Sequence, residues 1–187
     1  MGYHKGYADD SAQKEDPCGR AEPKADARCS EEFAASGGGG VRNGEDSLVK
    51  ITTFDFEEHG DERGILISLE EQKNIPFDIR RCYFMYNTLP GVRRGFHAHK
   101  TLRQVLVCVR GSCKILLDDG AEKQVVSLDR PNKGLYITAD TWREMYDFSE
   151  DAVLMVLADQ LYDESDYIRD YDAFLAYIAR KSGKEKA

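Results

Sequence analysis

Two histidines one residue apart, followed closely by an alternating apolar run, constrain this chain more than any other feature. His97 and His99 precede Gln104, which opens the run 105–109. Side chains alternate between two faces along extended backbone, so both imidazoles should face one site. The pattern predicts two neighbouring strands, antiparallel if they pair, with a pair of histidines on one face.

From residue 47 onward the chain has the pattern of an all-β protein. Short strand-like runs are separated by turns, and Asp-Asp-Gly at 118–120 favours a tight hairpin. Apolar residues recur at helical spacing over 171–178, in a helix that we expect Ser165 to cap. We predict an antiparallel β-barrel or jelly roll over residues 47–160, followed within residues 161–187 by one packing helix.

The N-terminal part of the chain differs in composition from the rest. Residues 1–46 contain four consecutive glycines and few aliphatic side chains, so we predict a disordered tail. The next residues, 48–56 and 64–70, are predicted to form two strands around a turn at 59–64.

A further predicted strand, residues 79–87, has two faces of different character. Arg81 and Tyr83 lie on one face, where a guanidinium and a phenol could bind sugar hydroxyls or phosphate, unless this face is simply solvated. Cys82 and Phe84 lie on the other face, which is mostly apolar and is expected to face the core.

Charge and cysteine content limit the partners. The net charge of −8 disfavours nucleic acid, although a few local arginines could still hold a nucleotide. No apolar run approaches the roughly 20 residues of a membrane helix, and we expect a cytoplasmic protein. The five cysteines include no CxxC pair, and we expect Cys82 and Cys108 to be small core residues.

The histidine spacing resembles the first motif of the cupins, which are small β-barrels. In metal-binding cupins, this pair, an acid and a later histidine are the ligands. Here Gln104 and Arg143 hold the last two positions, and neutral amides are poor ligands for divalent cations. We therefore expect no metal, and a pair of imidazoles that exchange protons near neutral pH.

Seven motifs in combination narrow this resemblance to one family. They are Arg94-Gly-Phe-His-Ala-His-Lys100, Gln104-Val-Leu-Val, Gly111-Ser-Cys, Leu116-Leu-Asp-Asp-Gly120, Gly134-Leu-Tyr-Ile, Trp142-Arg-Glu-Met and Tyr162-Asp-Glu-Ser-Asp-Tyr-Ile. Together they resemble the dTDP-4-keto-6-deoxyglucose 3,4-ketoisomerases, over about residues 48–178. The resemblance implies a cupin-type barrel, a homodimer built by shared or exchanged strands, a dTDP-linked 4-keto-6-deoxyhexose as substrate and no cofactor.

The implied reaction moves a carbonyl from C4 to C3 of the sugar through an enediol. It needs a base, a donor for the developing oxyanion and a route for protons between adjacent oxygens. The resemblance assigns the base to His97, and to His99 the task of shuttling protons or orienting the enediol. Their spacing alone does not order the two histidines, because they share a face.

Five further residues are candidates for substrate contact. The planar guanidinium of Arg94 suits bidentate binding to a pyrophosphate. Lys100 is either a second substrate contact or a charged residue at the edge of the site. Gln104 and Tyr83 could hydrogen-bond the hexose. Trp142 could stack on a base or sugar, or pack in the core.

Two more residues enter through the resemblance. Arg63 matches an Arg-Gly turn near the nucleotide site. Arg143 stands where relatives can carry histidine; it either alters catalysis or adds a phosphate contact. The rival functions are a 3,5-epimerase, which pairs one histidine with an aspartate and a tyrosine, a sugar-nucleotide-binding cupin without turnover, and a metal-dependent dioxygenase.

Overall fold

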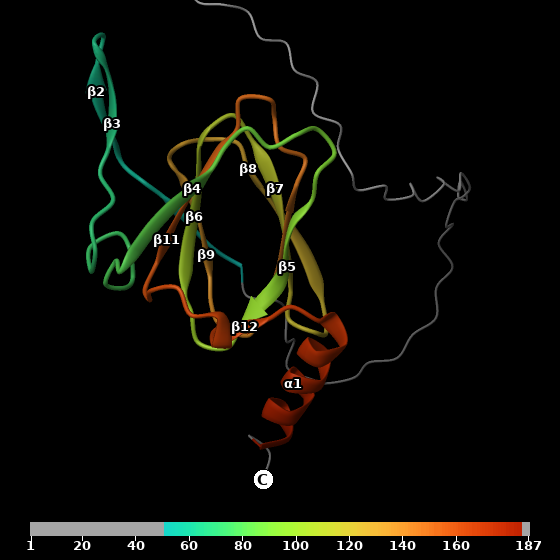
Figure 1. The fold of residues 1–187 in the computed structure, drawn as a ribbon. Helices are drawn as coiled ribbons and strands as arrows, with labels where there is room; N and C mark the ends of the chain where they lie inside the picture. Colours follow the sequence, from blue (N-terminus) through green and yellow to red (C-terminus); the bar gives the residue numbers. More distant parts are fainter. Residues whose placement is uncertain (1–50, 185–187) are drawn as a thin grey trace, which may run out of the picture. The chain divides into compact units, whose positions relative to one another are not determined.

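Two five-stranded antiparallel sheets, a separate two-stranded hairpin and one C-terminal helix make up the described part of the chain (Figure 1). The computed structural model describes residues 51–184, so the tail predicted at 1–46 lies outside the described residues. The sheets have the orders β1-β9-β6-β11-β4 and β12-β5-β10-β7-β8, and the predicted all-β class with a C-terminal helix is confirmed. The strands are β1 Thr52–Asp55, β2 Glu58–Asp61, β3 Gly64–Ile67, β4 Arg81–Met85, β5 Arg94–His99, β6 Gln104–Arg110, β7 Cys113–Asp118, β8 Lys123–Leu128, β9 Lys133–Ile137, β10 Trp142–Tyr146, β11 Val153–Ala158 and β12 Tyr167–Ile168; the helix is α1 Tyr171–Lys184.

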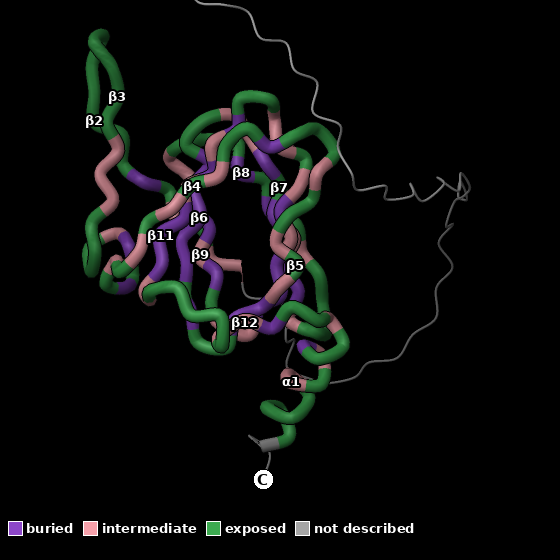
Figure 2. The backbone as a smooth tube through the Cα atoms, viewed as in Figure 1, coloured by how far each residue is buried: buried purple, intermediate pink, exposed green. Residues whose placement is uncertain are grey.

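The main core lies between the two sheets, where alternate side chains of both are buried (Figure 2). Cys108, as predicted, is fully buried there. The hairpin predicted at Asp-Asp-Gly joins β7 to β8: Asp119 accepts hydrogen bonds from two backbone amides of the turn, and Gly120 has a φ of 90°. Alternation with period two thus places one face of each central strand in this core.

The prediction of two strands around a turn at residues 59–64 was wrong in its boundaries. β1 ends at Asp55 and pairs with β9, whereas β2 and β3 form a separate hairpin with a shorter turn. The side chain of Asp61 accepts a hydrogen bond from the backbone N–H of Arg63, and Gly64 follows with a φ of 146°, a conformation that L side chains rarely adopt. A Cβ on Gly60 would meet the Gly64 carbonyl at 2.2 Å, so this close pairing needs glycine.

The prediction for β4 was right for one face and wrong for the other. Arg81 and Tyr83 face a polar cavity, but Cys82 and Phe84 are exposed rather than buried. β4 is the edge strand of its sheet, and Phe84 on its outer face is 62% exposed. Alternation correctly separated the residues into two faces but could not show which face was inside.

The segment after residue 160 contains more than a helix. A 3₁₀ turn, Glu164–Asp166, precedes β12, which pairs with β5. The helix begins only at Tyr171. The side chain of Asp170 accepts a hydrogen bond from the backbone N–H of Ala173, so Asp170 rather than Ser165 caps the helix. Its Phe174 is fully buried beside β5 and β10.

Within residues 51–184, no helix combines the length and apolarity needed to cross a membrane.

Candidate active site

A bulge in β5 places the two histidines at the cavity. Arg143 of β10 pairs with His97 and Glu144 pairs with Gly95, so Phe96 is an extra residue. Gly95 has a φ of 94° and Phe96 a φ of 51°, and a Cβ on Gly95 would lie 2.7 Å from the Arg143 carbonyl. Such bulges bend a strand and re-aim the side chain that follows. The glycine before the histidines is therefore required by backbone geometry.

The two imidazoles lie on one face, as predicted. Their ring centroids are 4.9 Å apart, and the ring of Tyr167 lies 5.0 Å from His97 and 4.2 Å from His99. The Nδ1 atoms have different partners, each at 2.9 Å: the backbone carbonyl of Gly95 for His97 and the carboxylate of Asp166 for His99. Within residues 51–184 neither Nε2 has a recorded hydrogen bond, and that of His99 is buried behind the cavity described below.

A buried cation lies beneath the histidines. Arg143 is 1% exposed, and its guanidinium donates to the side-chain oxygen of Gln104 at 3.1 Å and to the carbonyl of Thr138 at 3.4 Å. Gln104 in turn donates to the hydroxyl of Tyr83 at 2.8 Å. Among the described residues no carboxylate pairs with Arg143 within 4.0 Å. A buried charge without an ion-pair partner at this distance favours an anion in the adjacent space.

These surroundings keep both histidines neutral. Burial, and then the charge of Arg143, lower the pKa of His97 from 6.5 to about 4. Burial, Arg143 and His97 together lower the pKa of His99 to about 3, against the opposing effect of Asp166. Burial also lowers the pKa of Arg143 to about 10, so this residue stays charged at pH 7.

A cavity of about 400 Å³ opens between β4 and β5, the neighbouring β10 and the segment around β12. It brings together three of the predicted residues, His97, Tyr83 and Arg94, while His99, Gln104 and Arg143 are buried behind it. Its lining is Arg81, Tyr83, Met85, Arg94, Gly95, His97, Met145, Tyr162, Tyr167 and Arg169. Arginines, phenols and an imidazole around one cavity suit an anionic, hydroxyl-rich ligand.

Three predicted residues lie away from this cavity. Arg63 is exposed on the β2–β3 hairpin and pairs with Asp61. Lys100 is exposed, and its ammonium donates to the carbonyl of Ser165 at 2.6 Å. Trp142 is 4% exposed and packs beneath α1, which is the core alternative rather than a ligand-stacking position.

Several site residues were missed in the sequence. Asp166, Tyr162, Tyr167 and Arg169 all reach the histidines or the cavity from the segment before α1. Three of them belong to the family motif at residues 162–168, which could have pointed to them. The expected helix cap at Ser165 assigned this segment to packing instead.

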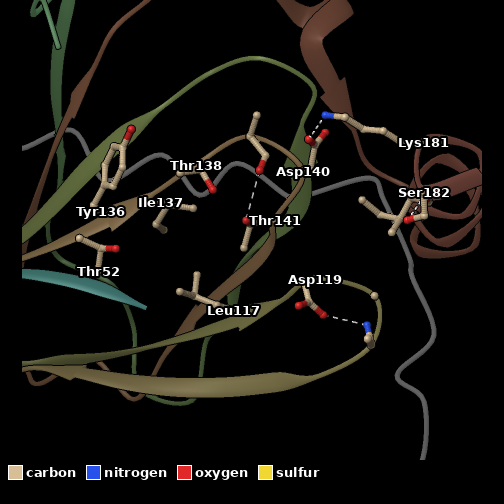
Figure 3. A pocket seen from close by; sticks show the side chains of 14 residues that line it. Thr52, Leu117, Asp119, Tyr136, Ile137, Thr138, Asp140, Thr141, Lys181 and Ser182 are labelled. Carbon is tan, nitrogen blue, oxygen red and sulfur yellow. Dashed lines mark hydrogen bonds and ion pairs between the residues drawn. The ribbon is translucent and has the colours of Figure 1, made fainter. Parts of the chain in front are cut away.

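A second, larger cavity of about 620 Å³ lies between α1, the β7–β8 turn and the β9–β10 connection (Figure 3). Its lining includes Asp119, Thr138, Asp140 and Thr141, and Lys181 of α1 forms an ion pair with Asp140. The backbone N–H of Asp140 donates to the His99 carbonyl at 2.7 Å, but no imidazole lines this space. This cavity is therefore larger than the first, but it holds neither histidine.

Comparison with known proteins agrees with this geometry. A family profile described as "FdtA: WxcM-like, C-terminal" matches residues 49–179. The TDP-4-oxo-6-deoxy-alpha-D-glucose-3,4-oxoisomerase of Aneurinibacillus thermoaerophilus is 54% identical over 127 residues, which are 68% of this chain and 91% of that protein.

Solved structures point the same way. A 3,4-ketoisomerase from Helicobacter canadensis is 49% identical, with a TM-score of 0.68 over 69% of this chain and 97% of its own. The enzyme QdtA from Thermoanaerobacterium thermosaccharolyticum, crystallised as a mutant with TDP-4-keto-6-deoxyglucose, is 41% identical, with a TM-score of 0.69 over 71% and 96%. ChmJ, a monoepimerase from Streptomyces bikiniensis, is 20% identical with a TM-score of 0.58 over 65% and 69%, and shares the fold alone. This chain therefore belongs to the family of the TDP-4-keto-6-deoxyglucose 3,4-ketoisomerases.

Proposed function

We propose that the protein converts a dTDP-linked 4-keto-6-deoxyhexose into its 3-keto isomer, in the biosynthesis of deoxyamino sugars in the cytoplasm. The observation that carries this proposal is the pair of neutral imidazoles beside a buried, unpaired guanidinium. Such an arrangement can remove a proton from carbon and stabilise the anion that results.

The reaction begins at C3, where the neighbouring C4 carbonyl makes the proton acidic. His97 is the base: its Nδ1–H donates to the Gly95 carbonyl, which leaves the lone pair of Nε2 for the substrate proton. The enediolate forms beside Arg143, whose fixed positive charge lowers its energy. His97 then returns its proton to C4, while the C3 hydroxyl proton passes to O4 with the help of His99. No net proton is gained or lost.

The rim of the cavity supplies the binding contacts. In this proposal Arg94, which lines the cavity, holds the diphosphate. Arg81 lies on the same cavity wall, with its guanidinium carbon 5.3 Å from the centre of the Tyr83 ring and 5.7 Å from that of the Tyr162 ring. The Nε of Arg81 is buried and has no hydrogen-bond partner within residues 51–184, so it can donate to a phosphate or sugar oxygen.

The same chemistry can be carried out without a cofactor or a resident metal. Gln104 is occupied by Tyr83 and Arg143, and the Arg143 charge beside the histidines disfavours a second cation. Stoichiometric iron in the purified protein, or loss of activity to a chelator, would contradict this part of the proposal.

The site contains the residue types that the alternative function, a 3,5-epimerase, would use. His99 pairs with Asp166 and touches Tyr167, which is the histidine, aspartate and tyrosine combination of that rival. The second histidine, His97, distinguishes the isomerase. A proton NMR time course with dTDP-4-keto-6-deoxyglucose in D₂O separates the two. Deuterium at C3 of the remaining substrate and at C4 of a new 3-keto species is expected; exchange at C5 would favour epimerisation, and saturable binding without exchange would favour a binding protein.

We also propose that the protein is a homodimer. Phe84 of β4 and Tyr86, just after this strand, are 62% and 59% exposed, and the β2–β3 hairpin exposes Ile65 and Leu66. Apolar surface of this kind is typical of interfaces, and an exchanged hairpin would carry Arg63 toward a partner's site.

Light scattering after size exclusion tests this assembly. Wild type should have about twice the 21.2 kDa chain mass, and Phe84→Glu should shift it toward the monomer. The control is Val125→Glu, which places the same charge on an exposed residue of β8, the edge of the other sheet. A monomeric wild type would rule out the dimer.

A further inference from the structure

The two histidines of the cavity differ in what holds them. His97 Nδ1 meets a neutral backbone carbonyl, whereas His99 Nδ1 lies 2.9 Å from the Asp166 carboxylate. Asp166 comes from the turn that precedes β12, and β12 pairs with the end of β5 so that Tyr167 lies opposite His99 (Figure 1). The carboxylate is thus delivered to the histidine by strand pairing.

The Asp166 carboxylate is itself held firmly. Its Oδ1 accepts a hydrogen bond from the backbone N–H of Thr101 at 2.9 Å and another from the Thr101 hydroxyl at 2.7 Å. Burial raises the pKa of this carboxyl, but hydrogen bonds from Thr101 and His99 outweigh the burial and lower it. Asp166 is therefore ionised at neutral pH and can only accept hydrogen bonds.

An ionised acceptor fixes the tautomer of its neutral histidine partner. His99 must carry its proton on Nδ1, which leaves the lone pair on Nε2. This Nε2 is buried, and within residues 51–184 it has no hydrogen-bond partner. A buried acceptor beside the cavity is suited to a donor that arrives with the substrate, such as a sugar hydroxyl.

We propose that Asp166 is a positioning residue, which holds His99 in the Nδ1–H tautomer so that Nε2 carries the hydroxyl proton from O3 to O4. This inference rests on the proposed isomerisation. His99 Nε2 takes the proton from the C3 hydroxyl, and its N–H then gives the same proton to O4, so the residue ends as it began. His97 handles the carbon-bound proton, and the two histidines have separate tasks.

The wild-type tautomer can be measured directly and without turnover. Nitrogen-15 NMR of histidine-labelled protein, with His99→Asn used to assign the signals, should show His99 protonated at Nδ1 and unprotonated at Nε2. A wild-type His99 protonated at Nε2 would overturn the proposal. If the wild type fails to isomerise the sugar, the proposed function fails, but this measurement still decides the tautomer.

Asp166→Asn tests the consequence for catalysis. The amide can donate to Nδ1 and so allow the other tautomer; kcat should fall roughly 10²-fold or more, with KM within about threefold. Asp159→Asn is the matched control, because Asp159 is equally buried, at 9% against 10%, and bonds Arg103 rather than a histidine. The control should leave kcat and the tautomer unchanged. A wild-type kcat in Asp166→Asn, or an equal loss in the control, would contradict the role.

Discussion

The two cavities of this molecule differ in chemistry more than in size. The larger one, beside α1, is lined by threonines, aspartates and Lys181, and its lysine is paired with Asp140. The smaller one is lined by arginines and phenols around His97, above an arginine that has no carboxylate partner among the described residues. Unpaired charge and available lone pairs, rather than volume, distinguish the site from a gap between packed elements.

The largest expected effect comes from removing the base of the smaller cavity. His97→Asn should slow exchange of the C3 proton by roughly 10²- to 10⁴-fold, because no other group replaces the Nε2 lone pair. Affinity for dTDP should stay near that of wild type, since the arginines remain. Proton exchange in D₂O and calorimetric titration measure the two quantities. Wild-type exchange in this variant would remove His97 from the mechanism.

The next effect comes from the buried charge. In Arg143→Met the enediolate loses its cation, and kcat should fall roughly 10²-fold.

The same variant should change the pH dependence. The base must be unprotonated, so activity falls as the pH drops through its pKa, which is about 4 for His97 in the wild type. Without Arg143 this pKa should rise toward 6.5, and the acid limb of kcat/KM should move to higher pH.

Arg143→Lys is the matched control for this prediction. It keeps a positive charge, so its acid limb should stay closer to that of wild type even if the hydrogen bond to Gln104 is lost. An identical acid limb in the methionine variant and the wild type would show that Arg143 does not set the histidine pKa.

A smaller effect is expected at the rim. Arg94→Ala should weaken dTDP binding about 10- to 100-fold, the usual loss for a hydrogen bond to a charged group, while kcat at saturation changes little. Lys100→Ala is the control, because its ammonium bonds the Ser165 carbonyl and lies outside the cavity lining. Equal losses in the two variants, measured by calorimetric titration, would contradict the phosphate role of Arg94.

The sequence could predict the features that depend on neighbouring residues, but not those that depend on contacts between distant parts of the chain. Local patterns were sufficient for the histidine pair, the Asp-Asp-Gly hairpin and the two faces of β4, because strand alternation and turn geometry depend on neighbouring residues. Which face of β4 is inside depends on how the two sheets pack against each other, which only the assembled fold decides. Asp166 is 67 residues from His99 along the chain, so no local spacing could bring them together. Trp142 had two possible environments until α1 was placed over it.

The smallest expected effect lies in the larger cavity, where Lys181 pairs with Asp140. Both side chains are partly exposed, so the pair should contribute only about 0–1 kcal/mol to the free energy of unfolding. Lys181→Met should leave kcat within about twofold, because Asp140 reaches His99 through its backbone N–H and keeps that bond when the side-chain partner is lost. Thermal unfolding and steady-state kinetics check both statements. A tenfold loss of kcat without a loss of stability would mean that α1 positions His99 through this ion pair, and the larger cavity would then belong to the active site rather than stand in contrast to it.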